Sequence, residues 1–151
     1  MKILVTVGTT RFDSLIQYLD THLSSKYEVT MQIASGKYIP KRFPFIEFTP
    51  EIAKYYLNSD IIITHAGAGT IYKLLRMKKK ILIVPNSERV DDHQLEIAEY
   101  MKNGNYALSI NDFSELESSI EKVYSSNFNH YTSEQFFKSE ELAHFIEETL
   151  K

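Results

Sequence analysis

Three segments of the sequence place small, hydroxyl, amide or imidazole residues directly after an apolar run. The first is Gly8-Thr9-Thr10, which follows "KILVTV". Glycine lets a ligand approach the backbone closely, and hydroxyls just before a helix favour an anion, which free N–H groups and the helix dipole also attract. The same residues fit an ordinary turn with a threonine as the helix N-cap. This segment alone leaves both interpretations open.

The second segment is "THAGAGTIYKLL", residues 64–75, after three consecutive isoleucines. Gly67 and Gly69 leave room for a diphosphate beside the backbone, Thr70 can cap a helix or donate a hydrogen bond, and His65 can reach the same crevice. A strand followed by a glycine-rich turn and a helix is also common in α/β proteins. His65 alone fits a buried histidine with satisfied ring nitrogens equally well.

The third segment is "PNSERVDDHQ", residues 85–94. Asp91 or Asp92 suits the N-cap of the next helix, whereas His93 and Gln94 suit hydrogen bonds to a hydroxyl-rich ligand. We expect no metal site and no cofactor, because the histidines and carboxylates lack a recognisable ligand spacing.

The composition excludes several classes of protein. Seventeen Lys and Arg against twenty Asp and Glu give a net charge of −3, which does not support a nucleic-acid partner. The absence of cysteine excludes disulfides, thiolate zinc sites and a cysteine nucleophile, and it indicates a cytoplasmic protein. No run approaches the roughly 20 apolar residues of a spanning helix.

The elements that must position these segments alternate between strands and helices, which predicts an α/β fold with a parallel sheet. Ligands of such sheets bind outside the carboxyl ends of the strands, where the three segments would meet. A short helix after Pro50 is expected to carry an apolar stripe of Ile52, Ala53, Tyr56 and Leu57. The predicted strands are residues 2–7, 28–34, 45–49, 60–65, 80–85 and 106–110.

Two further features bear on assembly. Arg76, Lys78, Lys79 and Lys80 form a basic cluster, which suits either a helix C-terminus or an anionic lipid surface. A last amphipathic helix, ending at Leu150, must cover an apolar surface, either on its own sheet or on a partner.

The order of "VTVGTTRFDSLI", "HAGAGT" and "DDHQLEIA" resembles the glycosyltransferase family 28 C-terminal domain. More narrowly, it resembles the small cytosolic subunit of the two-subunit N-acetylglucosaminyltransferase that extends dolichol-linked chitobiose, and its bacterial counterparts. The resemblance implies a Rossmann-like parallel sheet flanked by helices, equivalent to the C-terminal half of a GT-B glycosyltransferase. Residues 1–124 would form the nucleotide-sugar-binding domain, and residues 125–151 a loop and helix of the same unit or for partner docking.

The resemblance also implies roles for individual residues. Gly8, Thr9 and Thr10 would lie beside the phosphates of the donor, and His65 would be an electrostatic or positioning group in catalysis. A glutamate that often binds the ribose in this family is replaced by Lys73. The implied substrate-binding residues of the other two segments are Gly67, Ala68, Gly69, Thr70, Asp92, His93 and Gln94.

The implied activity is the inverting transfer of a sugar, GlcNAc or another hexose, from a UDP-sugar to a polyprenyl-diphosphate-linked saccharide. A membrane-anchored partner subunit would bind the acceptor, supply the base and hold this chain at the membrane, so the chain alone is expected to be inactive. The alternative is a non-catalytic nucleotide-binding or assembly module. A dinucleotide-dependent oxidoreductase is disfavoured, because "VGTTRF" lacks the G-x-G-x-x-G pattern.

Overall fold

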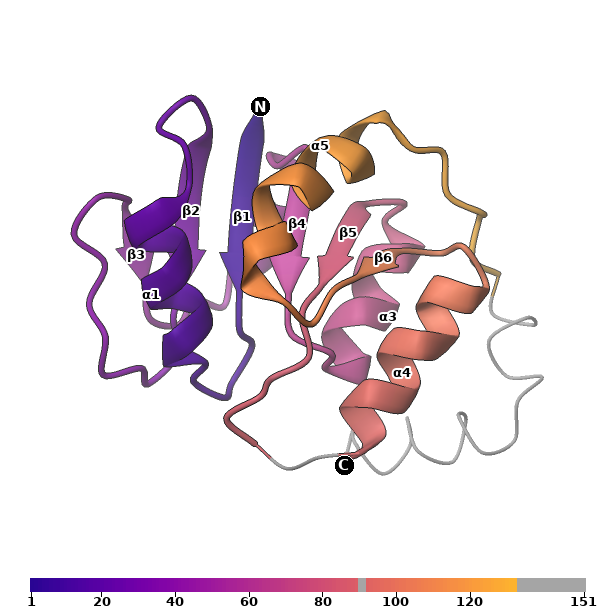
Figure 1. The fold of residues 1–151 in the computed structure, drawn as a ribbon, viewed down its shortest axis with the longest axis horizontal. Coiled ribbons are helices and arrows are strands. Elements are labelled where there is room, and N and C mark those ends of the chain that lie inside the picture. The colour runs from indigo at the N-terminus through magenta and orange to yellow at the C-terminus, as the bar shows by residue number, and fades with distance from the viewer. Residues whose placement is uncertain (90–91, 133–151) are drawn as a thin grey trace.

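The computed structural model describes residues 1–89 and 92–132, which form one parallel six-stranded sheet with helices on both faces (Figure 1). The strand order is β3-β2-β1-β4-β5-β6, and every pairing is parallel. The predicted parallel sheet is therefore confirmed. The strands are β1 (Lys2–Thr6), β2 (Glu28–Gln32), β3 (Phe45–Ile46), β4 (Ile61–Thr64), β5 (Lys80–Ile83) and β6 (Leu108–Ser109).

The helices cover the two faces of the sheet and bury a separate apolar cluster on each. One cluster joins the sheet to α1 (Asp13–His22) and α5 (Leu116–Ser125), and the other joins it to α2 (Ile52–Leu57), α3 (Ala68–Arg76) and α4 (Asp92–Asn103). In β4, Ile61 and Ile63 contribute to the first cluster and Ile62 to the second. This two-sided burial explains the unbroken apolar run of the central strand.

The predicted apolar face of α2 is correct at Ile52 and Tyr56, which contact the second apolar cluster, and wrong at Leu57. Only Tyr56 is buried in α2, whereas Leu57 is 67 % exposed. Consecutive residues of an α-helix point about 100° apart, so Leu57 turns toward solvent when Tyr56 faces the core. Asp112 caps the element before α5: its carboxylate accepts from Ser114 N at 2.9 Å, and a 3-10 turn (Phe113–Glu115) precedes the helix.

The chain after α5 folds back onto the sheet domain. Asn129 N donates to the Asn105 carbonyl at 2.8 Å, Phe128 contacts the first apolar cluster and Tyr131 the second. The helix expected to end at Leu150 lies outside the described residues. Within residues 1–89 and 92–132, no helix is long and apolar enough to cross a membrane.

The strand order defines where a ligand can enter. The chain winds outward from β1 in one direction and from β4 in the other, so β1 and β4 are neighbours whose following loops diverge (Figure 1). Open parallel sheets bind ligands at such a switch point, outside the carboxyl ends of the strands. The segments after β1 and β4 are Gly8-Thr9-Thr10 and His65–Thr70.

Candidate functional site

The turn after β1 is shaped by Gly8, which has a φ of +66°. This left-handed conformation favours glycine. A Cβ on Gly8 would also lie 2.9 Å from His65 Cε1, so the imidazole ring occupies the space that a side chain would need. The glycine is therefore required by both the backbone and its neighbour.

Gln32, the last residue of β2, holds this turn and was not predicted as a site residue. Its Oε1 accepts from Val7 N at 3.2 Å and Gly8 N at 3.1 Å. The Gly8 N–H is therefore engaged within the protein, whereas the hydroxyls of Thr9 and Thr10 follow it in the turn. The available signal was a glutamine within an otherwise buried strand segment.

His65 is buried, with 8 % of the residue exposed, directly after β4. Its Nδ1 lies 3.4 Å from Thr64 Oγ1. Burial lowers the pKa of His65 to about 4, against a hydrogen bond with the Thr6 backbone that raises it, and the charge of Arg89 lowers it further. The ring is therefore neutral at pH 7 and is a weak base.

A glycine is required at position 67 for the same steric reason as at position 8. A Cβ on Gly67 would lie 2.8 Å from His65 Cε1, so both glycines adjoin the Cε1–Nε2 edge of the imidazole. Gly67 is the N-cap of α3 and supplies no side-chain cap. The first N–H groups of a helix have no partner within it. In the first turn, Ala68 is buried, whereas Gly69 and Thr70 are half-buried.

A cavity of about 450 Å³ opens between these two turns and the edge of the sheet. Thr6, Gly8 and Thr9 line one side, and Thr70 reaches it from α3. Burial raises the pKa of Tyr56, and a hydrogen bond with Thr6 opposes this rise. The remaining lining residues are Gln32, Phe48, Thr49, Pro50, Ile52 and Tyr56. The cavity thus combines an apolar wall with hydroxyl groups beside a glycine turn.

Lys73 lies close to this cavity. Its Nζ is 5.7 Å from the centroid of the Tyr56 ring, which lines the cavity wall. A cation over a tyrosine face is attracted by the ring. Lys73 therefore places a positive charge beside the cavity, at the position where the family resemblance led us to expect a glutamate.

The residues of the third predicted segment have different surroundings in the structure. Gln94 is buried, and its Oε1 accepts from Asn86 N at 2.9 Å, so its amide oxygen holds the loop after β5. His93 is exposed, with Nδ1 3.7 Å from Glu96 Oε2. Asp92 begins α4, and Asp91 lies outside the described residues. Of His93 and Gln94, His93 has the accessible side chain.

Hydrogen bonds join the loop after β5 to the turn after β1. Asn86 Nδ2 donates to the Arg11 carbonyl at 3.1 Å, and Arg89 Nη1 donates to Thr10 Oγ1 at 3.2 Å. Asn86, which sequence reasoning missed, is 4 % exposed and so belongs to the framework of the site. The segments after β1 and β5 therefore form one connected rim.

The N-terminus of α1 is not capped by a threonine. Its N-cap is Phe12, and the carboxylate of Glu88 accepts from Ser14 N at 3.3 Å. The N-cap interpretation of Thr9 and Thr10 is thus wrong, because the chain runs on through Arg11 and Phe12 before the helix begins. Among residues 1–89 and 92–132, no group of three His, Asp or Glu side chains could hold a metal ion.

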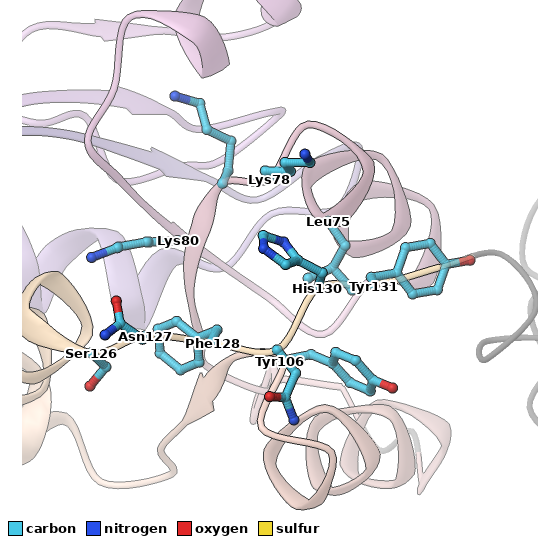
Figure 2. Close-up of a pocket in the computed structure, with 11 residues that line it drawn as sticks. Leu75, Lys78, Lys80, Tyr106, Ser126, Asn127, Phe128, His130 and Tyr131 are labelled. Carbon is cyan, nitrogen blue, oxygen red and sulfur yellow. The ribbon is translucent and has the colours of Figure 1, made fainter.

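A second cavity, of about 370 Å³, lies at the opposite, amino end of the sheet (Figure 2). Lys80, His130 and Tyr131 are among its lining residues. Lys79 Nζ donates to the Ser59 carbonyl at 2.8 Å, and Lys80 Nζ donates to the Tyr124 carbonyl at 2.6 Å. These two lysines of the basic cluster therefore serve carbonyls at the C-terminal ends of neighbouring helices.

Known proteins match both the sequence and the fold. The human UDP-N-acetylglucosamine transferase subunit ALG13 is 33 % identical over 113 residues, covering 66 % of this chain and 10 % of that protein. The subunit of the same name from Yarrowia lipolytica is 31 % identical over 116 residues, covering 66 % of this chain and 59 % of that protein. This chain thus spans about a tenth of the human relative.

The fold is shared with glycosyltransferases of the GT-B class. The crystal structure of MurG from Acinetobacter baumannii has a TM-score of 0.62 at 20 % identity, covering 81 % of this chain and 40 % of that chain. The glycosyltransferase SnogD from Streptomyces nogalater has a TM-score of 0.61 at 14 % identity, covering 98 % of this chain and 38 % of that chain. The glycosyltransferase family 28 C-terminal domain matches residues 2–149, and this chain belongs to that family.

Proposed function

We propose that this chain is the donor-binding subunit of an inverting glycosyltransferase, which transfers GlcNAc or another hexose from a UDP-sugar to a polyprenyl-diphosphate-linked saccharide. The observation that carries the proposal is the crevice at the switch point, where the Gly8 turn and the N-terminus of α3 lie on either side of His65. The names of the relatives, which include a UDP-N-acetylglucosamine transferase subunit, support the donor class.

The diphosphate would lie between the turn after β1 and the start of α3. Thr9 and Thr10 would bind it from one side, and the N–H groups and hydroxyl at Gly69 and Thr70 from the other. The nucleoside would enter the cavity of about 450 Å³, whose Phe48 and Pro50 supply apolar surface. The sugar would then extend toward the start of α4, where His93 is accessible.

The chain would stabilise the departing nucleoside diphosphate. Helix-end N–H groups and hydroxyls placed at the phosphates favour the charge that develops as the glycosidic bond to the donor breaks. His65 would act as a positioning group, because a neutral, buried imidazole with a pKa of about 4 is a weak general base at pH 7. The base that deprotonates the acceptor hydroxyl would come from another subunit.

A membrane-anchored partner would therefore complete the enzyme and hold this chain at the cytoplasmic side of the membrane. It would carry the acceptor site and the base, and the isolated chain would be inactive. The partner assignment is supported by the word "subunit" in the names of the relatives.

Calorimetry with a panel of UDP-sugars tests the donor assignment. Gly69→Asp places a carboxylate in the first turn of α3 and should abolish binding by repelling the diphosphate. Ser118→Asp, on the exposed surface of α5, adds the same charge away from the site and should leave binding unchanged. Selective binding of one UDP-sugar, lost only in Gly69→Asp, is the expected result.

Two other outcomes separate the alternatives. Binding that requires the anchored partner would place the completed donor site at the interface between the subunits. Nucleotide binding without sugar transfer, even with the partner and a lipid-linked acceptor present, would identify a non-catalytic module instead. The absence of binding under all of these conditions would contradict the donor assignment.

A further inference from the structure

Gln32 is a buried polar residue at the point where the cavity meets the sheet. It is 4 % exposed, it ends β2, and it lines the cavity of about 450 Å³ together with Gly8. A buried amide side chain costs free energy unless its donors and acceptor are satisfied. The partners of Gln32 therefore indicate what the residue is used for.

The side-chain oxygen of Gln32 accepts three hydrogen bonds from residues at the end of β1. Thr6 Oγ1 donates to Oε1 at 2.6 Å, Val7 N at 3.2 Å and Gly8 N at 3.1 Å. These bonds reach from β2 to the residues at which the neighbouring strand turns away. They fix the backbone just before Thr9 and Thr10.

The side-chain nitrogen of Gln32 joins two walls of the cavity. Nε2 donates to the Gly8 carbonyl at 2.9 Å and to the Glu47 carbonyl at 2.7 Å. Gly8 belongs to the turn after β1, whereas Glu47 precedes Phe48 and Thr49, which line the opposite wall. One amide group thus sets the distance between the turn and the wall.

Packing alone does not require this arrangement. A leucine or methionine would fill similar volume between β1 and β3, but it would leave the Gly8 and Glu47 carbonyls and the Val7 and Gly8 N–H groups without these partners. The use of both amide atoms on the same turn is a positioning device.

We propose that Gln32 is the positioning residue of the donor site, which holds the Gly8 turn at the distance from Phe48 and Thr49 that lets the diphosphate and the nucleoside bind together. The inference deepens the proposed function and rests on it for the identity of the ligand. It acts through the turn, since Gln32 itself need not contact the donor.

Gln32→Glu is the sharpest variant, because it replaces only the donating NH₂ group. An ionised carboxylate would face the Gly8 and Glu47 carbonyls, while a protonated carboxyl would restore one donor. Burial and the two facing carbonyls should raise the pKa of the new carboxyl by more than the Thr6, Val7 and Gly8 donors at its other oxygen lower it. UDP-GlcNAc does not titrate between pH 5 and 8, so its own charge stays constant across the experiment.

The expected result is a loss of UDP-GlcNAc affinity on the order of tenfold to a hundredfold at pH 8, with recovery of most of it at pH 5. Gln17→Glu makes the same change on the exposed face of α1 and should show neither effect. Melting curves at both pH values establish that each variant is folded. An unchanged affinity at pH 8, or a loss that is the same at pH 5, would overturn the proposal.

Amide hydrogen exchange tests, without a ligand, whether Gln32 holds the Gly8 turn. The Gly8 N–H donates to Gln32 Oε1, so it should exchange faster in Gln32→Met, which lacks that acceptor, than in the native chain, relative to amides in the middle of β1. Equal protection of Gly8 in both chains would overturn the proposal. If no UDP-sugar binds to the native chain, with or without the anchored partner, the proposed function fails, while the exchange result still decides whether Gln32 holds the Gly8 turn.

Discussion

The two ends of the sheet offer cavities of similar size built from different chemistry. The cavity at the carboxyl end, about 450 Å³, adjoins two glycine turns, a neutral buried histidine and hydroxyl groups. The cavity at the amino end, about 370 Å³, is lined by aromatic rings and by a row of lysines. Two of those lysines, Lys79 and Lys80, donate to carbonyls of the chain itself.

The difference shows why cavity size is a poor guide to the site. At the amino end, lysine ammonium groups donate to backbone carbonyls of the chain, and these hydrogen bonds stabilise the fold. At the carboxyl end, the parallel strands bring helix starts and small residues together, and Gly8 and Gly67 keep side chains out of the space around His65. Variants at the two ends should therefore separate effects on binding from effects on stability.

Gly67→Ala should have the largest effect. The new Cβ would lie 2.8 Å from His65 Cε1, so the ring or the start of α3 must move. We expect a loss of about 3 kcal/mol in the free energy of unfolding, measured in urea, together with weaker UDP-sugar binding.

The double variant with His65→Ala identifies the cause of that loss. Removing the ring makes room for the new methyl group, so the second substitution should cost less in the Gly67→Ala background than in the native chain. Strictly additive losses would contradict the steric role assigned to His65.

The second largest effect should be a pH dependence of stability that is caused by the low pKa of His65. Its pKa in the folded chain is about 4, below the ordinary value of 6.5, so the unfolded chain takes up a proton that the folded chain excludes. Stability is then full above pH 6.5 and falls as the pH drops toward 4. We expect a loss of about 2 kcal/mol between pH 7 and pH 5 that is absent in His65→Gln. Equal pH dependence of the two chains would refute the low pKa.

Lys79→Met tests the amino end. Lys79 Nζ donates to the Ser59 carbonyl at 2.8 Å, just after α2, and its loss should lower the free energy of unfolding by about 1 kcal/mol. Lys78→Met, which removes an exposed ammonium from the same cavity rim, is the matched control and should change little. Neither substitution should alter UDP-sugar affinity, and a clear loss of affinity in either would argue against the division between the two ends.

Arg89→Gln should have the smallest effect. The Arg89 charge helps to lower the pKa of His65, so its removal should raise that pKa slightly. An NMR titration of the His65 ring measures the change directly, and a lower pKa in the variant would contradict the expected sign.

Most of the fold was predictable because the central strands are buried on both faces. The isoleucine run of β4 must be covered on two sides, which only a central strand of a layered α/β fold provides. Which residues of a short helix face the core was less predictable. In α2, hydrophobicity indicated that both Tyr56 and Leu57 face the core, but consecutive helix residues point about 100° apart, and Leu57 lies on the exposed side.

The site was predictable in part, because glycines and hydroxyls next to strand ends have a local meaning. The supporting residues were not, since their roles depend on partners far away in sequence. Gln32 serves a turn 24 residues earlier, and Asn86 bonds to Arg11, 75 residues away. Gln94 was assigned to the ligand, although its oxygen holds the loop after β5, because nothing in "DDHQ" reveals which side chain turns inward.

The most direct test of the donor site is an NMR titration of the isotopically labelled chain with UDP-GlcNAc, observed at the backbone amides. The proposed function predicts that the shifts concentrate at Gly8, Thr9, Gly69 and Thr70, while the amides of Asn129 and His130 at the amino end stay in place. Shifts that instead gather at Asn129 and His130, with the glycine turns unchanged, would contradict it.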